Sequence, residues 1–131
     1  MKSILVTGGA RSGKSHYAQE LALKSGKKVL FVATAEAGDE EMKQRIKAHQ
    51  SSRPREWSTL EATANVGKEI LKKGGGAEVI IVDCITMLVN NVFSRYADYT
   101  AEKIDADQAD AEVTREVSDL IECLDRLDAT F

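Results

Sequence analysis

The sequence predicts an α/β fold in which helices cover both faces of a mostly parallel sheet. Three short apolar runs are typical of buried strands, namely Ser3–Thr7, Val29–Ala33 and Val79–Val82. Segments with helical spacing of their apolar residues lie between these runs and are joined to them by short loops. Strands that alternate with helices are joined by crossover connections, so we expect the strands to pair in parallel.

The first two helices have recognisable ends. The first is predicted over 13–24, and Gly26 follows it as a stop of the kind found at helix C-termini. The second is predicted over 39–50, with Asp39 as its N-cap. It should end before Pro54, because the residue before a proline is disfavoured in the α conformation.

The second half of the chain continues the alternation. We expect a short strand at 57–60, a helix over 62–72 and the start of another helix over 85–92. The polar stretch 94–107 is interpreted as a loop, and an amphipathic helix over 113–125 follows it.

Length and composition indicate one domain spanning residues 1–131. A net charge of −3 argues against a nucleic-acid partner, and no apolar run reaches the roughly 20 residues of a membrane span. Cys84 and Cys123 are far apart and lack metal-site spacing, which favours reduced thiols in the cytoplasm. Ala129–Phe131 resembles the start of another strand, so we expect a truncated form whose C-terminal strands are missing.

A glycine-rich motif follows the first predicted strand directly. It fits the pattern G-x-x-x-x-G-K-[ST] and consists of Gly8, Gly9, Ala10, Arg11, Ser12, Gly13, Lys14 and Ser15. Its backbone N–H groups and the following helix N-terminus can cradle phosphates, Lys14 can reach the β and γ phosphates, and Ser15 can ligate Mg²⁺. The alternative is a turn that only joins two elements. The setting between a strand and a helix favours the phosphate loop.

Two other residues are candidates for chemistry. Asp83 closes the third apolar run, where a carboxylate can hold Mg²⁺ beside a phosphate loop; the alternative is an N-cap for the helix that follows. His49 lies at helical spacing from Met42 and Ile46. From its position alone, His49 is more often packed or solvated than catalytic.

A family resemblance adds to this interpretation. Ile4–Ser15 resembles the start of the bifunctional adenosylcobinamide kinase / adenosylcobinamide-phosphate guanylyltransferase family. The resemblance spans most of residues 3–92 and continues through Val32-Ala33-Thr34-Ala35, Asp39-Glu40-Glu41-Met42, Arg45-Ile46, His49, Arg53-Pro54, Trp57, Thr59, Glu61 and Val82-Asp83-Cys84-Ile85-Thr86.

The resemblance implies a RecA-like, three-layer P-loop NTPase fold and a cytoplasmic, homotrimeric enzyme of corrinoid assembly. Such an enzyme phosphorylates adenosylcobinamide with a nucleoside triphosphate, GTP or ATP, in the presence of Mg²⁺. It then transfers GMP from GTP through a guanylyl-histidine and gives adenosylcobinamide-GDP. The guanylylated histidine falls on His49, and Lys14 is the second residue expected to act in catalysis. The implied nucleotide contacts are Gly8 to Ser15, Ala33, Thr34, Ala35, Gln50, Ser51, Ser52, Arg53, Glu61 and Asp83.

Several alternatives stay open at this point. Thr34, Arg53 and Glu61 could be an ordinary strand end and two surface charges. The protein could be another P-loop kinase acting on a small alcohol, which would leave His49 without a role. It could also be a nucleotide-dependent switch, although the chain has no Asn-Lys-x-Asp segment of the kind signalling GTPases use. Finally, the chain could bind nucleotide and catalyse nothing, because family members continue past the position of Phe131 with an Asn-Glu-Val-Gly-like stretch that is absent here.

Overall fold

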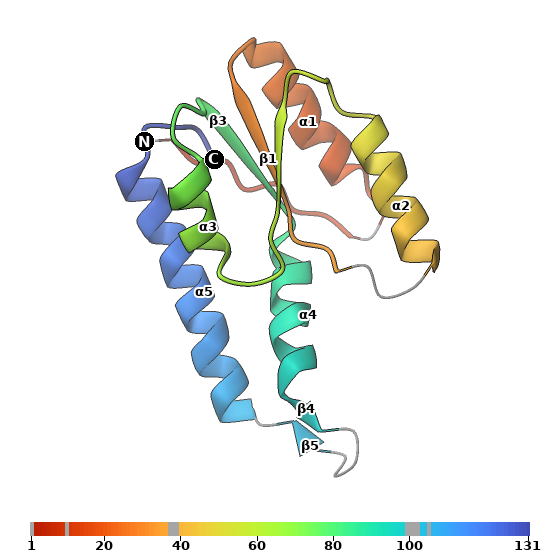
Figure 1. Ribbon diagram of the computed structural model, residues 1–131, viewed down its shortest axis with the longest axis vertical. Coiled ribbons are helices and arrows are strands. Elements are labelled where there is room, and N and C mark those ends of the chain that lie inside the picture. Colours follow the sequence, from red (N-terminus) through yellow and green to blue (C-terminus); the bar gives the residue numbers. More distant parts are fainter. Residues whose placement is uncertain (1, 10, 37–39, 99–102, 105) are drawn as a thin grey trace.

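A parallel sheet of three strands forms the centre of the molecule in a computed structural model, which describes residues 2–9, 11–36, 40–98, 103–104 and 106–131 (Figure 1). β1 (Val29–Ala33) lies between β2 (Ser58–Glu61) and β3 (Val79–Asp83). In this register Phe31 is opposite both Thr59 and Ile81, and both pairings are parallel. The predicted parallel α/β arrangement is therefore confirmed.

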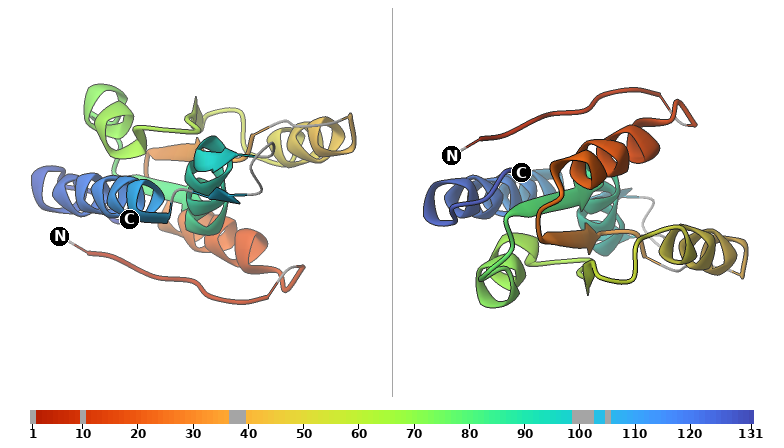
Figure 2. Two further views of the ribbon diagram at one scale, coloured as in Figure 1. Left: turned by 90° about the horizontal axis from the view of Figure 1, so that it is seen from below. Right: turned by 90° about the horizontal axis from the view of Figure 1, so that it is seen from above.

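Helices cover both faces of this sheet (Figures 1 and 2). α1 (Lys14–Ser25) packs on one face, and α3 (Val66–Lys73) and α5 (Ala106–Arg126) pack on the other. α2 (Glu40–Ser51) lies at the periphery, and α4 (Ile85–Tyr96) leads away from the carboxyl end of β3. The result is a three-layer molecule with the sheet in the middle layer.

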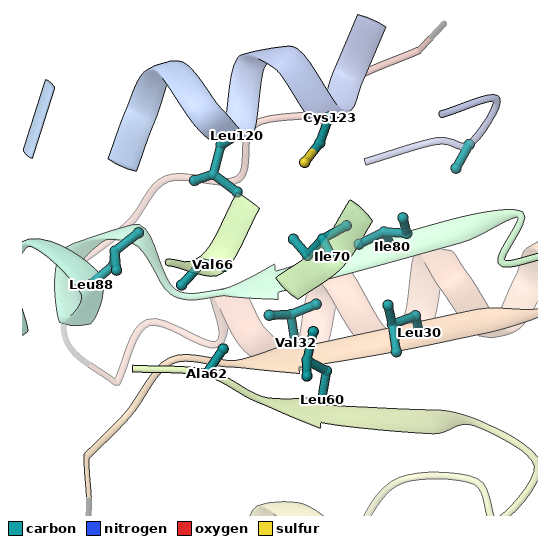
Figure 3. Close-up of a cluster of buried hydrophobic side chains, with 11 residues drawn as sticks. Leu30, Val32, Leu60, Ala62, Val66, Ile70, Ile80, Leu88, Leu120 and Cys123 are labelled. Carbon is teal, nitrogen blue, oxygen red and sulfur yellow. The ribbon is translucent and has the colours of Figure 1, made fainter. Parts of the chain in front are cut away.

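The core is divided between the two faces because side chains of a strand alternate in direction. On β1, Leu30 and Val32 point toward α3 and α5, whereas Val29 and Phe31 point toward α1. Figure 3 shows the larger cluster, in which Val32 and side chains of α3, α5 and β3 meet between the layers. Burying each large apolar side chain stabilises the fold by about 1.5–3 kcal/mol, so this face supplies much of the driving force.

The α3–α5 contact depends on a glycine and a buried carboxylate. A Cβ atom added to Gly67 would lie 2.5 Å from the backbone carbonyl carbon of Asp119, so the two helices approach as closely as they do because no side chain intervenes. The Cys123 thiol donates to the Gly67 carbonyl at 2.9 Å. Glu116 is 1% exposed and accepts the backbone N–H groups of Asn65 at 2.6 Å and Val66 at 3.2 Å. α5 therefore satisfies the first donors of α3, which has no side-chain cap of its own at Asn65.

The predicted strand Ser3–Thr7 is wrong. The N-terminal segment reaches the sheet only at its start, where Lys2 pairs with Thr130, which in turn pairs with Val79. Phe131 donates its N–H to the Lys2 carbonyl at 3.0 Å and accepts the N–H of Ile4 at 2.7 Å. Beyond Ile4 no described strand lies alongside to exchange hydrogen bonds, and Leu5 is 78% exposed. An apolar run does not become a strand where it has no neighbour to pair with.

Other boundaries also differ from the prediction. The stretch 94–107 is not a loop in its described parts, because α4 continues to Tyr96, β4 (Ala97–Asp98) pairs with β5 (Lys103–Ile104), and α5 begins at Ala106. Its polar side chains misled the prediction, since exposed helix faces are polar as well.

The ends of three predicted helices can be compared in the same way. The helix expected over 62–72 begins only at Val66. Gly26 ends α1 in the left-handed conformation with its N–H on Leu23, as predicted. The predicted N-cap Asp39 lies outside the described residues.

Within the described part, no helix is both long and apolar enough to cross a membrane.

Candidate functional site

The N-terminus of α1 is open for an anion. Gly13 precedes the helix with φ 88°, a left-handed conformation that suits glycine. Because glycine has no side chain, it makes no side-chain capping hydrogen bond to the helix N-terminus. The first turn of α1 contains no acidic residue. Its first backbone donors are therefore available, and the helix dipole favours negative charge there.

The loop before α1 is held in a tight shape by its own backbone. A Cβ atom on Gly8 would lie 2.4 Å from the Ser12 Oγ, so a larger residue at position 8 would displace the Ser12 side chain. The Ser12 N–H donates to the Gly9 carbonyl at 3.2 Å, and Arg11 has a positive φ of 59°. Ala10 lies outside the described residues. A tight turn with positive φ values is compatible with the phosphate loop that the sequence predicts.

Lys14 and Ser15 sit at the beginning of α1 and are half-buried. The Lys14 Nζ lies 3.5 Å from the Gly8 carbonyl oxygen, at the limit of a hydrogen bond. Such a long contact leaves the ammonium group free to move onto a phosphate.

The carboxyl ends of the three strands meet at one edge of the sheet. Ala33 at the end of β1 is opposite Glu61 at the end of β2 and Asp83 at the end of β3. Open α/β sheets bind ligands outside the carboxyl ends of their strands. Glu61, Asp83 and the Thr34–Ala35 turn, which the sequence singled out, therefore share this edge.

Thr34 joins the ends of β1 and β3. Its side chain is fully buried; its Oγ1 donates to the Cys84 carbonyl at 2.6 Å and accepts the Cys84 N–H at 2.8 Å. The Thr34 N–H donates to the Asp83 carbonyl at 3.1 Å. The hydroxyl is thus used both as donor and as acceptor, and it fixes where the chain leaves Asp83.

Cys84 begins α4. Its carbonyl accepts the Leu88 N–H at 3.3 Å, and its Sγ accepts the Met87 N–H at 3.4 Å. Capping of α4 therefore involves Cys84, and the carboxylate of Asp83 stays at the strand end, half-buried.

A cleft of about 710 Å³ brings the first group of predicted residues together. It lies between α1, β3 and the N-terminal segment, and Lys14, Ser15 and Asp83 all line it. Among the described residues, no group of three or more His, Cys, Asp or Glu side chains gathers into a metal site. One carboxylate and one hydroxyl nevertheless fit Mg²⁺, which usually binds one or two carboxylates together with substrate phosphates and water.

A second group gathers where α2 returns to the sheet. The Gln50 Nε2 donates to the Glu61 Oε1 at 2.6 Å, which ties the last turn of α2 to the end of β2. The Ser51 hydroxyl is bonded to the carbonyls of Lys47 and Ala48 in its own helix. Ser52 closes the same helix end, with its N–H on the Ala48 carbonyl at 3.2 Å.

Arg53 is placed by stacking. Its guanidinium carbon lies 3.8 Å from the centroid of the Phe31 ring, and its Nη1 donates to the Thr59 hydroxyl at 3.3 Å. Its Nε is buried without a hydrogen-bond partner among the described residues. Burial lowers the pKa of Arg53, while the charges of Asp83 and Glu61 act in the opposite direction. The guanidinium therefore lies in the field of both carboxylates at the edge of the sheet.

The structure brings several of the predicted residues to this edge, namely Thr34, Gln50, Arg53, Glu61 and Asp83, and Lys14 and Ser15 line a cleft together with Asp83. His49 lies in α2 directly before Gln50, but its side chain is outside the described part of the structure. Sequence reasoning missed two residues that support the site, Phe31 under Arg53 and the buried Asn91 on α4. In the sequence they are an aromatic residue in a predicted strand and an amide residue in a predicted helix. Both occurrences are common, so neither indicates a functional site.

The amino-acid sequence is similar to that of a known protein family. A sequence model of the family described as cobinamide kinase / cobinamide phosphate guanyltransferase matches residues 4–131. The bifunctional adenosylcobalamin biosynthesis protein CobP of Pseudomonas aeruginosa is 42% identical over 88 residues, which are 67% of this chain and 51% of that protein.

Two further relatives carry the name bifunctional adenosylcobalamin biosynthesis protein CobU. The Escherichia coli protein is 35% identical over 127 residues, or 96% of this chain and 70% of that protein. The Salmonella typhimurium protein is 40% identical over 89 residues, or 68% of this chain and 49% of that protein. The chain thus spans about half the length of two of these curated relatives.

Proposed function

Because the chain belongs to the cobinamide kinase / cobinamide phosphate guanyltransferase family, we propose that it carries the nucleotide site of an enzyme that acts twice on adenosylcobinamide. The observation that supports this most directly is the cleft between α1, β3 and the N-terminal segment, which Lys14, Ser15 and Asp83 line together. The proposed substrates are a corrinoid and a nucleoside triphosphate, GTP or ATP, and the product is adenosylcobinamide-GDP.

In the first proposed reaction, the hydroxyl of adenosylcobinamide attacks the γ-phosphorus of the nucleotide. A new P–O bond forms, the bond from the γ-phosphorus to its bridging oxygen breaks, and the hydroxyl proton passes to a general base. The phosphate loop orients the triphosphate, and Lys14 neutralises charge on its β and γ groups. Ser15 and Asp83 would hold Mg²⁺, which when bound neutralises further phosphate charge.

In the second proposed reaction, His49 acts as nucleophile. A neutral imidazole is available at neutral pH because an unperturbed histidine has a pKa of about 6.5. A ring nitrogen attacks the α-phosphorus of GTP, an N–P bond forms, and pyrophosphate leaves as its P–O bond breaks. A phosphate oxygen of adenosylcobinamide phosphate then attacks the same phosphorus, and the N–P bond breaks to restore the histidine.

The other predicted contacts support the same assignment. Gln50, which directly follows His49, bonds Glu61 at the end of β2, and the charge of Glu61 acts on Arg53. We propose that this group contacts the part of the nucleotide beyond the triphosphate. Two free cysteines and a nucleotide substrate support a cytoplasmic location, and we propose a homotrimer as the assembly, which light scattering of the purified protein would test.

The deciding experiment labels the protein with GTP. The chain is incubated with Mg²⁺ and GTP labelled at the α-phosphate, beside GTP labelled at the γ-phosphate. We expect an acid-labile, base-stable label from the α position only. His49→Ala should abolish it, whereas His16→Ala should keep it, because His16 is an exposed residue paired with Glu20 on α1.

Two outcomes would count against the proposal. Label that persists in His49→Ala would exclude His49 as the nucleophile. If neither this chain nor a version lengthened to the size of its relatives takes up label, guanylyl transfer is refuted. A P-loop kinase for another small alcohol would then remain, since the phosphate loop and Asp83 fit that reaction equally well.

A further inference from the structure

Asn91 is a buried amide on α4 that bonds two separate segments. It is 5% exposed, and its Nδ2 donates to the Thr34 carbonyl at 2.8 Å and to the Thr63 carbonyl at 3.2 Å. An asparagine amide nitrogen carries two N–H groups, so both of its donors are used. A buried polar group costs free energy unless it is hydrogen-bonded, and here the amide bonds two backbone carbonyls.

These two carbonyls lie where adjacent strands leave the sheet. Thr34 follows β1 directly, and Thr63 follows β2 by two residues. α4, which carries Asn91, begins immediately after β3. One side chain therefore connects the exits of all three strands in the order β2-β1-β3.

The connection continues to the residues of the proposed site. Thr34 bonds Asp83 and Cys84 through its backbone N–H and hydroxyl. Ala62 bonds the Ala33 carbonyl with its N–H at 3.0 Å, beside Glu61. Movement at the Thr34 carbonyl or the Thr63 carbonyl would therefore move Asp83 and Glu61 relative to one another.

Only certain side chains can donate to both the Thr34 and the Thr63 carbonyl from position 91. Asn91 lies on the same face of α4 as Leu88, at a spacing of three residues. Leu88 is buried in the apolar core, so the next turn of that face would ordinarily be apolar as well. An amide there has a role other than filling space, because an aliphatic residue of similar size would leave both carbonyls without a donor.

We propose that Asn91 is a positioning residue for the nucleotide site, which sets Asp83 and Glu61 at the distance that Mg²⁺-bound nucleotide needs. The inference rests on the proposed function. Asn91 lies beneath the carboxyl edge and acts through Thr34 and the turn at Thr63. Its loss should therefore weaken the Mg²⁺-dependent part of nucleotide binding while leaving the phosphate loop intact.

The first test measures local order without nucleotide. Amide hydrogen exchange is compared for the unmodified chain, Asn91→Ala and the matched Asn90→Ala, which changes an exposed neighbour on the same helix. In Asn91→Ala we expect the amides of Thr34 and Cys84 to exchange at least about tenfold faster, with Phe31 as an unchanged internal reference. Asn91→Gln keeps both donors on a longer stem, and it should fold and show the same effect at reduced size if the alanine variant does not fold.

The second test measures GTP affinity by calorimetry with and without Mg²⁺. For Asn91→Ala we expect about a tenfold loss of affinity in Mg²⁺ and little change in its absence, while Asn90→Ala matches the unmodified chain. Unchanged exchange at Thr34 and Cys84 would overturn the proposal. So would faster exchange with undiminished affinity in Mg²⁺, because Asn91 would then be merely structural. If the unmodified chain binds no GTP, the proposed nucleotide site itself fails. That result is distinguishable from failure of the Asn91 proposal, because it is seen without any substitution.

Discussion

The guanidinium of Arg53 stacks on the ring of Phe31, 3.8 Å from its centroid, although α2 lies between the two residues in the sequence. Phe31 is 2% exposed and lies in the central strand, so its position is set by the core. A cation over an aromatic face is attracted by the ring quadrupole, and this attraction grows when both groups are withdrawn from water. The central strand of the sheet therefore holds a charge at the edge of the proposed site.

Replacing Arg53 should weaken nucleotide binding more than replacing a nearby arginine. For Arg53→Ala we expect about a tenfold loss of GTP affinity by calorimetry, because a desolvated cation beside the site is lost. Arg53→Lys should recover only part of the lost affinity, since an ammonium group neither stacks on an aromatic ring nor donates two parallel hydrogen bonds as a guanidinium does. The matched control is Arg55→Ala, which alters an exposed side chain two residues away. Equal losses in the Arg53 and Arg55 variants would contradict a specific role.

Glu116 should contribute strongly to stability. Glu116→Ala removes a buried carboxylate that accepts two N–H groups of α3, and it leaves those donors without partners. We expect the free energy of unfolding in urea to fall by about 3 kcal/mol. Glu122→Ala on the same helix removes only an exposed pair with Arg126 and should cost less than about 1 kcal/mol. A Glu116 variant as stable as the Glu122 variant would show that water replaces the carboxylate at no cost.

The close contact of α3 with α5 makes Gly67 sensitive to a single methyl group. The added Cβ of Gly67→Ala would meet the backbone of Asp119, which cannot turn aside as a flexible side chain would. Overpacking of this kind costs about 1–3 kcal/mol, and we expect a lower midpoint in thermal unfolding. Gly75→Ala meets nothing within 4 Å and serves as the control. Should both variants melt at the same temperature, α5 must be able to move away from α3 freely.

Stability should fall at alkaline pH partly through Cys123. Burial raises the pKa of the Cys123 thiol above its ordinary value of 9.0, and the charges of Asp119 and Glu122 add to this. The folded pKa is the higher one, so this contribution is complete below the unfolded pKa. It is lost as pH rises from the unfolded pKa through the folded pKa, at up to about 1.4 kcal/mol per pH unit.

The measurement is urea unfolding between pH 7 and pH 11 for the unmodified chain and Cys123→Ala. Lysines and tyrosines titrate in both proteins, so the difference between the two curves isolates the thiol. We expect the unmodified chain to lose stability more steeply with pH than Cys123→Ala. Parallel curves would mean that the Cys123 thiol ionises equally easily in both states.

Much of this fold follows from local signals. The apolar runs at β1 and β3 are long enough and bounded sharply enough to identify buried parallel strands. The glycine-rich motif predicts the start of α1, which begins at Lys14, and it indicates where a nucleotide would be expected. Asp83 could be assigned to the same edge because the carboxyl ends of parallel strands meet there.

The remaining features depend on contacts between distant segments. The run at 3–7 has the composition of a strand, but only pairing with a neighbour makes one, and here pairing stops at Ile4. Glu116 and Asn91 look like ordinary helix residues until the segments whose donors and carbonyls they satisfy are packed against them. The stacking of Arg53 on Phe31 likewise requires that the end of α2 return to the sheet.

Trp57 gives this region an optical property of its own. It is the single tryptophan of the chain, and it packs against the apolar cluster that contains Phe31, beneath Arg53. Indole emission responds to the polarity and charge around the ring, so the tryptophan fluorescence of the protein, excited selectively at wavelengths that tyrosine does not absorb, reports on one corner of the proposed site. Ligands that displace Arg53 can therefore be followed without a dye, and a ligand that stays at the phosphate loop should leave the signal unchanged.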